Sequence, residues 1–99
     1  MKAYQHPDLN SITLPKVMQA LSDPCRITIM KALIAQEELA CNELPVEVAK
    51  ATLSHHVAVL RDAGLILTRV EGTKCLNSVR EEAFKDFFPG LLDLLIQAD

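Results

Sequence analysis

The 99-residue chain has little aromatic, glycine or cysteine content. Aromatic side chains make up 4% of it, and it holds three glycines, five prolines and three cysteines. So few glycines and prolines leave little room for long loops, and an apolar fraction of 49% excludes a disordered chain. An odd number of cysteines at irregular spacing does not fit a secreted disulfide framework. The composition indicates one compact, aliphatic, mostly helical domain over residues 1–99.

Long apolar runs and targeting segments are also lacking. The N-terminus has no charged stretch followed by an apolar one, which a signal peptide requires. The most apolar run, residues 91–96, is short and is interrupted by Asp93, whereas a membrane helix needs about 20 apolar residues. We therefore expect a cytoplasmic protein with no membrane partner.

Charge is unevenly distributed along the chain. The formal net charge is -3, which taken alone argues against a nucleic-acid partner. Residues 50–80, however, hold five basic and two acidic side chains, a local charge of +3, whereas residues 1–49 and 81–99 carry -2 and -4. Because local charge governs contact with phosphates, residues 50–80 are a candidate for binding DNA.

Residues 50–64 have the pattern of a helix that reads DNA. An apolar stripe along one side consists of Leu53, Val57 and Leu60. The opposite side carries Ala51, Ser54, His55, Ala58 and Asp62. This face is slender and polar, with Lys50 and Arg61 on its flank, so hydroxyl and imidazole groups can read base edges while cations meet phosphates. Gly64 supplies the positive φ that ends such a helix.

After this helix the period changes from helical to alternating. Residues 66–71 and 74–79 are predicted to form two strands joined at Glu71-Gly72-Thr73. A hairpin that follows a reading helix is typical of the wing in a winged helix. It is expected to bring Arg69, Thr73 and Lys74 against the adjacent phosphates or the minor groove.

The remaining segments predict helices around this unit. Residues 1–12 are expected to be an extended arm, followed by helices over 14–22 and 24–36, the second capped by Asp23, and by a short helix over 42–46 capped by Asn42. Residues 81–99 form a C-terminal segment that Pro89-Gly90 breaks or kinks. Its apolar surface exceeds what one small domain can cover, so we expect a homodimer. The expected interface residues are Val17, Leu21, Phe84, Phe88, Leu91, Leu92 and Leu95.

Three stretches together resemble a known family: residues 20–26, residues 53–66 and Glu71-Gly72. The family is the ArsR/SmtB group of bacterial transcriptional regulators. The resemblance implies a mainly α fold with a small β-hairpin wing, the winged helix-turn-helix, in a homodimeric repressor that binds a palindromic operator in double-stranded DNA. It implies release by an inducer and no enzymatic activity or cofactor. By this likeness Ser54 and His55 reach base edges, and Lys50, Thr52 and Arg61 lie on or near the DNA backbone.

The chain departs from the family where metals bind. Many members carry Glu-Leu-Cys-Val-Cys before the reading unit, but residues 38–42 here are Glu-Leu-Ala-Cys-Asn, and residues 81–99 contain no histidine for a zinc site on the last helix. Neither family metal site can therefore be assembled, and the inducer is not expected to be a metal at those places.

The cysteines offer an alternative signal. Cys25 or Cys41 is a candidate thiol sensor for an oxidant, and Cys25 would be acidified by the helix N-terminus if it is exposed. A simpler interpretation is that both are small buried apolar residues. A hydrolase using Cys41 and His55 has no oxyanion-binding turn to support it. The alternative from another class is a winged helix that binds proteins and leaves its DNA face idle.

Overall fold

The structure is a computed structural model that describes residues 3–98. The elements in chain order are the 3-10 turn η1 (Leu9–Ser11), α1 (Leu14–Ala20), α2 (Pro24–Ala35), β1 (Leu39–Ala40), the 3-10 turn η2 (Cys41–Glu43), α3 (Lys50–Asp62), β2 (Ile66–Glu71), β3 (Lys74–Val79), the π-helical turn η3 (Ala83–Phe87) and α4 (Leu91–Gln97). The fold is mostly helical with one small sheet, which confirms the predicted mainly α class with a β-hairpin. Within residues 3–98 no helix has the length and apolarity needed to cross a bilayer.

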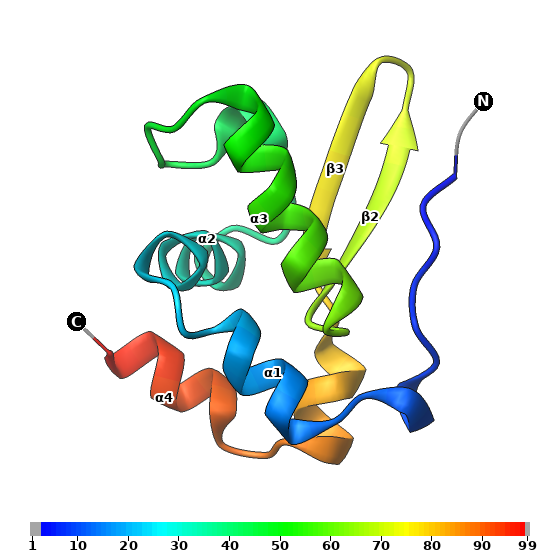
Figure 1. Ribbon diagram of the computed structural model, residues 1–99, viewed down its shortest axis with the longest axis vertical. Coiled ribbons are helices and arrows are strands. Elements are labelled where there is room, and N and C mark those ends of the chain that lie inside the picture. Colours follow the sequence, from blue (N-terminus) through cyan, green and yellow to red (C-terminus); the bar gives the residue numbers. More distant parts are fainter. Residues whose placement is uncertain (1–2, 99) are drawn as a thin grey trace.

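The core lies where α3 packs against α2, α1 and the base of the hairpin. The apolar stripe predicted for α3 is confirmed, since Val57 and Leu60 are 3% and 0% exposed and Leu53 packs at the edge of the core. Ile29 and Met30 of α2 are fully buried in the same cluster. The inward face of α3 is thereby fixed, and its outward face is left to solvent (Figure 1).

The sheet has three antiparallel strands in the order β1-β3-β2. The hairpin of β2 and β3 has the predicted bounds, with Ile66 opposite Val79 at its base and Glu71 opposite Lys74 at its tip. The strand β1 was not predicted, because two residues are too few to show alternation. The helix predicted over 42–46 is wrong: the structure has the shorter turn η2. Its start is held by Glu43, whose Oε1 accepts from the backbone N–H of Ala40 at 2.8 Å, and not by Asn42.

The ends of the long helices follow the predicted signals. Asp23 caps α2, because its Oδ1 accepts from the backbone N–H of Cys25 at 2.8 Å and of Arg26 at 3.3 Å. The helix α3 ends at Asp62 and is followed by Gly64, whose φ of 88° is the left-handed conformation predicted for it. Gly64 is buried, and a Cβ there would collide with the side chain of Ile12. The chain can therefore turn into β2 only with glycine at this position.

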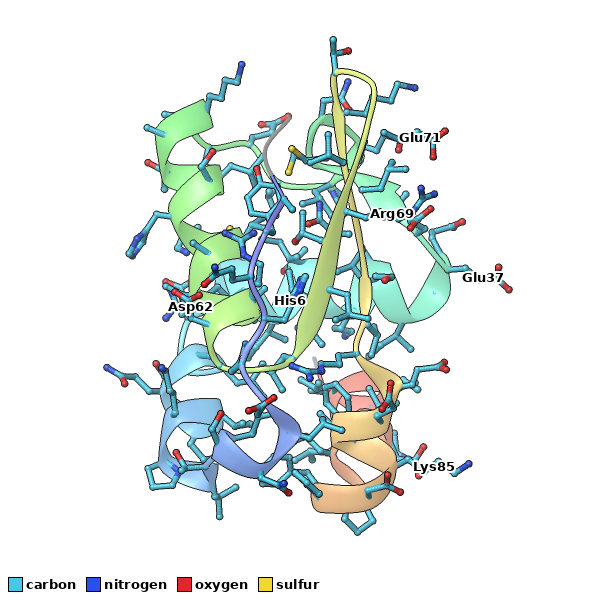
Figure 2. All side chains as sticks on the ribbon, turned by 90° about the vertical axis from the view of Figure 1, so that its right-hand side faces the viewer. His6, Glu37, Asp62, Arg69, Glu71 and Lys85 are labelled. Atoms are coloured by element: carbon cyan, nitrogen blue, oxygen red, sulfur yellow. The ribbon has the colours of Figure 1, made fainter. Side chains whose placement is uncertain are left out.

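The described part of the N-terminal arm is extended, as expected, apart from η1, and it packs along the edge strand β2 (Figure 2). The Nε2 atom of His6 accepts from the backbone N–H of Thr68 at 2.9 Å. Arg80 donates through Nη1 to the carbonyl oxygen of Pro7 at 2.6 Å. The arm thus covers the outer edge of the sheet and satisfies one of its backbone donors.

The C-terminal segment is two pieces, η3 and α4, separated at Pro89-Gly90. Four residues predicted for the dimer interface are buried in the chain's own core: Val17, Phe84, Leu91 and Leu95, which are 0 to 8% exposed. Three others, Leu21, Phe88 and Leu92, pack at its edge and are half-buried. The large apolar side chains left exposed on α1 and α4 are Leu14, Met18, Leu94 and Ile96. The four buried residues are therefore taken up by the chain's own core, and which residues a partner meets stays a prediction.

Candidate nucleic-acid interface

The N-terminal half of α3 presents a polar surface to solvent. Its exposed residues are Lys50, Ala51, Thr52, Ser54 and His55. The N-cap residue is Ala49, which makes no side-chain hydrogen bond to the first turn. The first backbone N–H groups of α3 therefore point outward without a capping side chain, at the positive end of the helix dipole. Such an end suits an anion such as a phosphate.

The tip of the hairpin is exposed in the same way. Gly72, Thr73 and Lys74 are all exposed, and neither Lys74 nor Lys50 takes part in an ion pair among the residues that the structure describes. The N-terminal end of α3 and the hairpin tip both lie at the end of the molecule opposite to α1 and α4 (Figures 1 and 2). Seven of the eight predicted DNA-binding residues are exposed in the structure: Lys50, Thr52, Ser54, His55, Arg69, Thr73 and Lys74.

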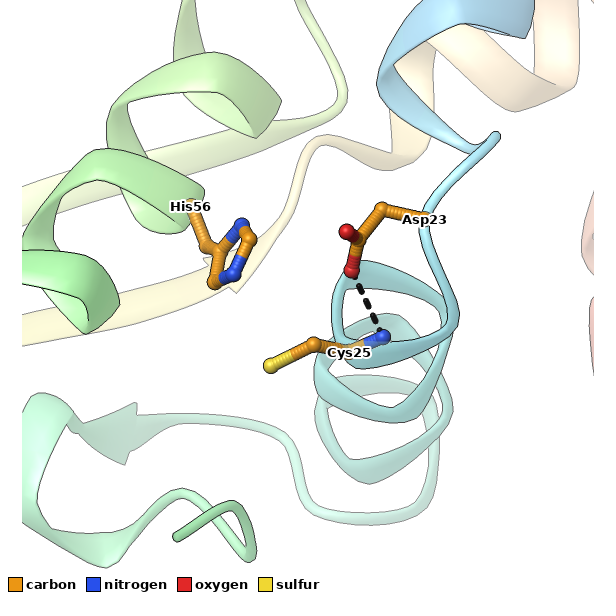
Figure 3. A group of neighbouring side chains, drawn as sticks. All are labelled: Asp23, Cys25 and His56. Atoms are coloured by element: carbon orange, nitrogen blue, oxygen red, sulfur yellow. Dashed lines mark hydrogen bonds between the residues drawn. The ribbon is translucent and has the colours of Figure 1, made fainter. Parts of the chain in front are cut away.

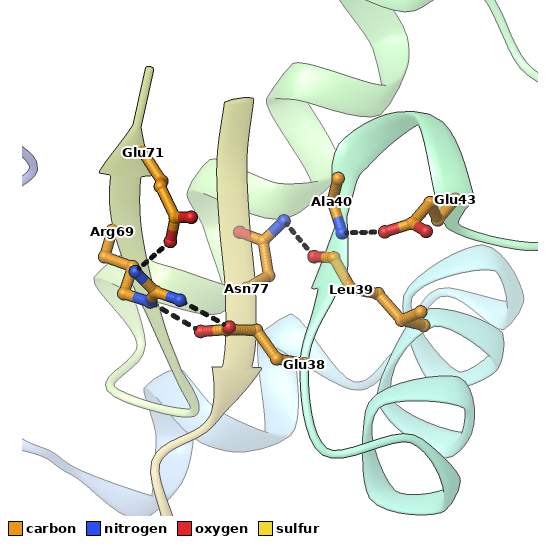
Figure 4. A network of polar contacts seen from close by, with 7 residues as sticks. All are labelled: Glu38, Leu39, Ala40, Glu43, Arg69, Glu71 and Asn77. Carbon is orange, nitrogen blue, oxygen red and sulfur yellow. Dashed lines mark hydrogen bonds and ion pairs between the residues drawn. The ribbon is translucent and has the colours of Figure 1, made fainter. Parts of the chain in front are cut away.

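Arg69, also predicted to meet DNA, is held by two carboxylates (Figure 4). Its Nε and Nη2 atoms each donate to Glu38 at 2.8 Å, and Nη1 donates to Glu71 at 2.7 Å. These hydrogen bonds raise the pKa of Arg69, and the bond from Arg69 holds the pKa of Glu38 below its usual range. The positive charge of Arg69, which was counted among the basic charges of residues 50–80, is thus paired with Glu38, a residue outside that segment.

Arg61 is turned toward the arm and the sheet. Its guanidinium carbon lies 4.3 Å from the ring centroid of Tyr4, a cation–π geometry, and Nη1 donates to Thr68 Oγ1 at 3.2 Å. Arg61 is half-buried as a result. Sequence reasoning could not find this arrangement, because Tyr4 is distant in the chain and has no pattern that pairs it with α3.

A buried polar pair beneath Arg61 was also missed. Thr68 and Asn77 are 4% and 0% exposed, and Thr68 Oγ1 donates to Asn77 Oδ1 at 2.9 Å. Asn77 Nδ2 donates to the carbonyl oxygen of Leu39 at 3.3 Å (Figure 4). The same Nδ2 atom lies 3.4 Å from Cys41 Sγ. These bonds join all three strands and tie them to the C-terminal end of α3. The sequence did not predict this pair, because one of its partners, Leu39, lies on the unpredicted strand β1.

His56 lies at the inward edge of α3 and is 9% exposed. Its partner is a side chain and not the backbone: Arg26 Nη1 donates to His56 Nδ1 at 3.1 Å. Arg26 also donates through Nε to the carbonyl oxygen of Ala20 at 2.6 Å. The contact links the first turn of α2 to the inward side of α3, so His56 is not part of the exposed face of that helix.

The cysteines are all free and half-buried. Burial, and then the negative charge of Asp23, raise the pKa of the Cys25 thiol above its ordinary value. Acidification of Cys25 was expected only if this residue is exposed. It is half-buried, and desolvation and the neighbouring carboxylate raise its pKa instead. Cys41 lies beside Asn77, and the Sγ atom of Cys75 is 3.2 Å from the hydroxyl of Tyr4.

Comparison with known proteins agrees with this arrangement. A family model described as a helix-turn-helix domain matches residues 21–69. An arsenical resistance operon repressor of Staphylococcus xylosus is 34% identical over 87 residues, which are 87% of this chain and 83% of that protein. An uncharacterized HTH-type transcriptional regulator of Bacillus subtilis is 36% identical over 83 residues, 81% of this chain and 83% of that protein.

A solved structure of an ArsR family transcriptional regulator has the same fold. It superposes with a TM-score of 0.66 at 29% identity, over 72% of this chain and 79% of that one. The family is one of DNA-binding transcriptional regulators and not a class of enzymes. The fold and these relatives together show that the chain belongs to the ArsR/SmtB family of winged helix-turn-helix transcriptional regulators.

Proposed function

We propose that this protein is a repressor that reads a palindromic operator as a homodimer, with α3 in the major groove. The observation that carries the proposal is the division of α3 into two faces. Val57 and Leu60 anchor it in the core, and its first turns expose small, hydroxyl and imidazole side chains beside a lysine. A helix needs such a slender polar face to approach base edges.

The proposed roles follow the exposure of each side chain. Ser54 and His55 contact base edges, and Lys50 and Thr52 contact the DNA backbone together with the uncapped N–H groups of α3. Thr73 and Lys74 at the hairpin tip meet the flanking phosphates. Arg61 is held by Tyr4 and Thr68 and supports α3 from the side of the sheet. Arg69 is exposed, but its charge is already paired with Glu38 and Glu71, so it contributes less to phosphate contact than Lys74.

The homodimer is proposed to form through α1 and α4, where Leu14, Met18, Leu94 and Ile96 are 48 to 63% exposed. Two copies related by a twofold axis would place two α3 helices on successive turns of one DNA face, about 34 Å apart. We expect Met18→Asp and Leu94→Asp to give monomers in sedimentation velocity. Val48→Asp, a charge at an apolar position 39% exposed outside both helices, is the matched control and should leave the dimer intact.

Release from DNA is proposed to depend on an inducer that does not use the motif positions of the metal-sensing relatives. Residues 38–42 hold one cysteine, Cys41, whose side chain faces the buried Asn77. A thiol sensor based on Cys25 has to overcome the raised pKa of that thiol. The inducer is therefore left as a small molecule to be identified.

The test is selection of duplexes from a random library by the purified protein under reducing conditions. The proposal predicts enrichment of one twofold-symmetric sequence, with binding that weakens steeply as salt is added because phosphate contacts release counterions. The control is the Lys50→Ala, Ser54→Ala, Lys74→Ala triple variant, which should enrich nothing. A wild-type protein that enriches no sequence would favour a winged helix that binds proteins.

A further inference from the structure

Three side chains with different metal-ligating groups meet where α3 passes the start of α2. Asp23 caps α2, Cys25 lies in its first turn, and His56 is on the inward side of α3. One ligand atom from each residue lies within 4.8 Å of the other two (Figure 3). Asp23 and Cys25 are half-buried and His56 is 9% exposed, so the cluster lies just below the surface.

We propose that Asp23, Cys25 and His56 form a binding site for one divalent cation of the zinc class, with water as the fourth ligand. A carboxylate oxygen, a thiolate and an imidazole are a donor set that zinc and cadmium accept and that magnesium and calcium do not favour. Around a tetrahedral ion such donors are about 3.5 Å apart. The cluster therefore needs a contraction of about 1 Å, within the reach of side-chain rotation.

The other bonds of these residues are compatible with a bound ion. The hydrogen bonds that Asp23 accepts from the backbone of α2 use Oδ1, and Oδ2 has no such bond among the described residues. The cap and the metal can therefore use different oxygens of one carboxylate. Metal ligands are commonly oriented by such second bonds.

Arg26 is the group with which the ion competes, because it donates to His56 Nδ1. Its guanidinium has further partners in the carbonyl oxygens of Ala20 at 2.6 Å and Gln19 at 3.4 Å. It can therefore give up the imidazole and remain hydrogen-bonded. Ion binding exchanges the contact of His56 with Arg26 for a ligand bond across the same two helices.

The ligands supply two negative charges, which match the charge of a divalent cation. Binding removes the proton of the Cys25 thiol, which passes to solvent, and the thiolate and the Asp23 carboxylate then neutralise both charges of the cation. Because a proton is released, affinity should rise with pH.

This cluster is separate from the two places that sequence comparison with metal-binding members points to. Those places are residues 38–42 and the C-terminal segment, whereas Asp23, Cys25 and His56 lie on α2 and α3. An ion here would connect the start of α2 to the inward side of the helix that carries the proposed DNA contacts. The binding site itself rests on the geometry of these two helices and not on the proposed function.

The experiment is a titration of the full reduced protein with Co²⁺, whose absorption reports thiolate ligands, followed by displacement with Zn²⁺. We expect one Co²⁺ per chain with a thiolate-to-cobalt charge-transfer band. Cys25→Ser should abolish that band. The matched controls Cys41→Ser and Cys75→Ser change the two other half-buried cysteines and should keep it.

Two further variants test the remaining ligands. Asp23→Asn keeps a helix cap and His56→Gln keeps an acceptor for Arg26, so both are expected to fold, as circular dichroism will check. Each should weaken Co²⁺ binding about tenfold or more. A band that survives in Cys25→Ser, or folded wild-type protein that gives no band, overturns the site. Both results are independent of DNA binding and do not bear on the proposed repressor function.

Discussion

The two ends of α3 are held in opposite ways. At its N-terminal end Lys50, Thr52 and Ser54 are exposed, and no side chain caps the first turn. At its C-terminal end Ala63, Gly64 and Leu65 are buried, and Arg61 is enclosed by Tyr4 and Thr68. Most of the C-terminal end is thus packed into the molecule, with Asp62 exposed, whereas the N-terminal end is open to solvent.

The difference separates stability from recognition along a single helix. Side chains that must match base edges need a rigid support, because a loosely held helix would present them in many positions. The enclosed end supplies that support through the arm, the hairpin base and the Thr68–Asn77 pair. Changes at this end should therefore act on folding, and changes at the open end on binding.

The largest expected effect is at the enclosed end. Gly64→Ala should destabilise the protein by about 2–4 kcal/mol, because the left-handed φ strains any other residue and the new Cβ collides with Ile12. Gly72→Ala is the matched control, since Gly72 has a φ of 62° but open space around it, and should cost about 1 kcal/mol. Urea denaturation measures both. Equal losses would show that the enclosure by Ile12 is unimportant.

The second-largest effect is on DNA binding, and it distinguishes Lys74 from the ion-paired Arg69 in the hairpin. Lys74→Ala should weaken binding to all duplexes alike and reduce the salt dependence of binding by about one phosphate contact. Arg69→Ala should change the salt dependence less, because its charge is already paired with Glu38 and Glu71. Lys85→Ala, an exposed lysine on η3 at the opposite end, controls for net charge. A larger effect for Arg69 than for Lys74 would contradict the assignment.

The smallest effect concerns the arm and pH. Burial, and then the charges of Arg80 and Arg61, lower the pKa of His6 below its usual value of about 6.5. The folded chain therefore disfavours the protonated ring. The contribution of His6 to stability is complete above about pH 6.5 and is lost as pH falls through the lowered pKa of the folded state.

Tyr4 reports this transition, because it is the one tyrosine in a chain without tryptophan. Its fluorescence should change as the pH falls below about 6.5, when the bond from Thr68 to His6 is lost and the arm loosens. His6→Gln keeps an acceptor and should flatten the change, whereas His55→Gln, an exposed histidine on α3, should not. Identical titrations of wild type and His6→Gln would be inconsistent with the proposed contact.

Local signals in the sequence predicted most of the fold. Asp23-Pro24 marked the start of α2, Gly64 marked the end of α3, and alternation marked both hairpin strands, since each feature depends on neighbours in the chain. The strand β1 escaped detection because it consists of two residues, and the burial of Asn77 depends on it.

The candidate site was predictable only in part. The exposed face of α3 follows from helical periodicity, and Ser54 and His55 lie where that pattern places them. The partners of Arg61 and Arg69 come from Tyr4 and Glu38, which no local pattern connects to them. The same holds for Asp23, Cys25 and His56, because the third member is distant in sequence and is brought in by the packing of α3 on α2.

The central claim is that the open end of α3 reads sequence. It is tested most directly by comparing Ser54→Ala and Lys74→Ala on the selected operator and on random duplex at one salt concentration. We predict that Ser54→Ala weakens operator binding by about 1–3 kcal/mol and leaves random duplex unchanged, and that Lys74→Ala weakens both equally. Equal effects of the two substitutions on both duplexes would contradict the account.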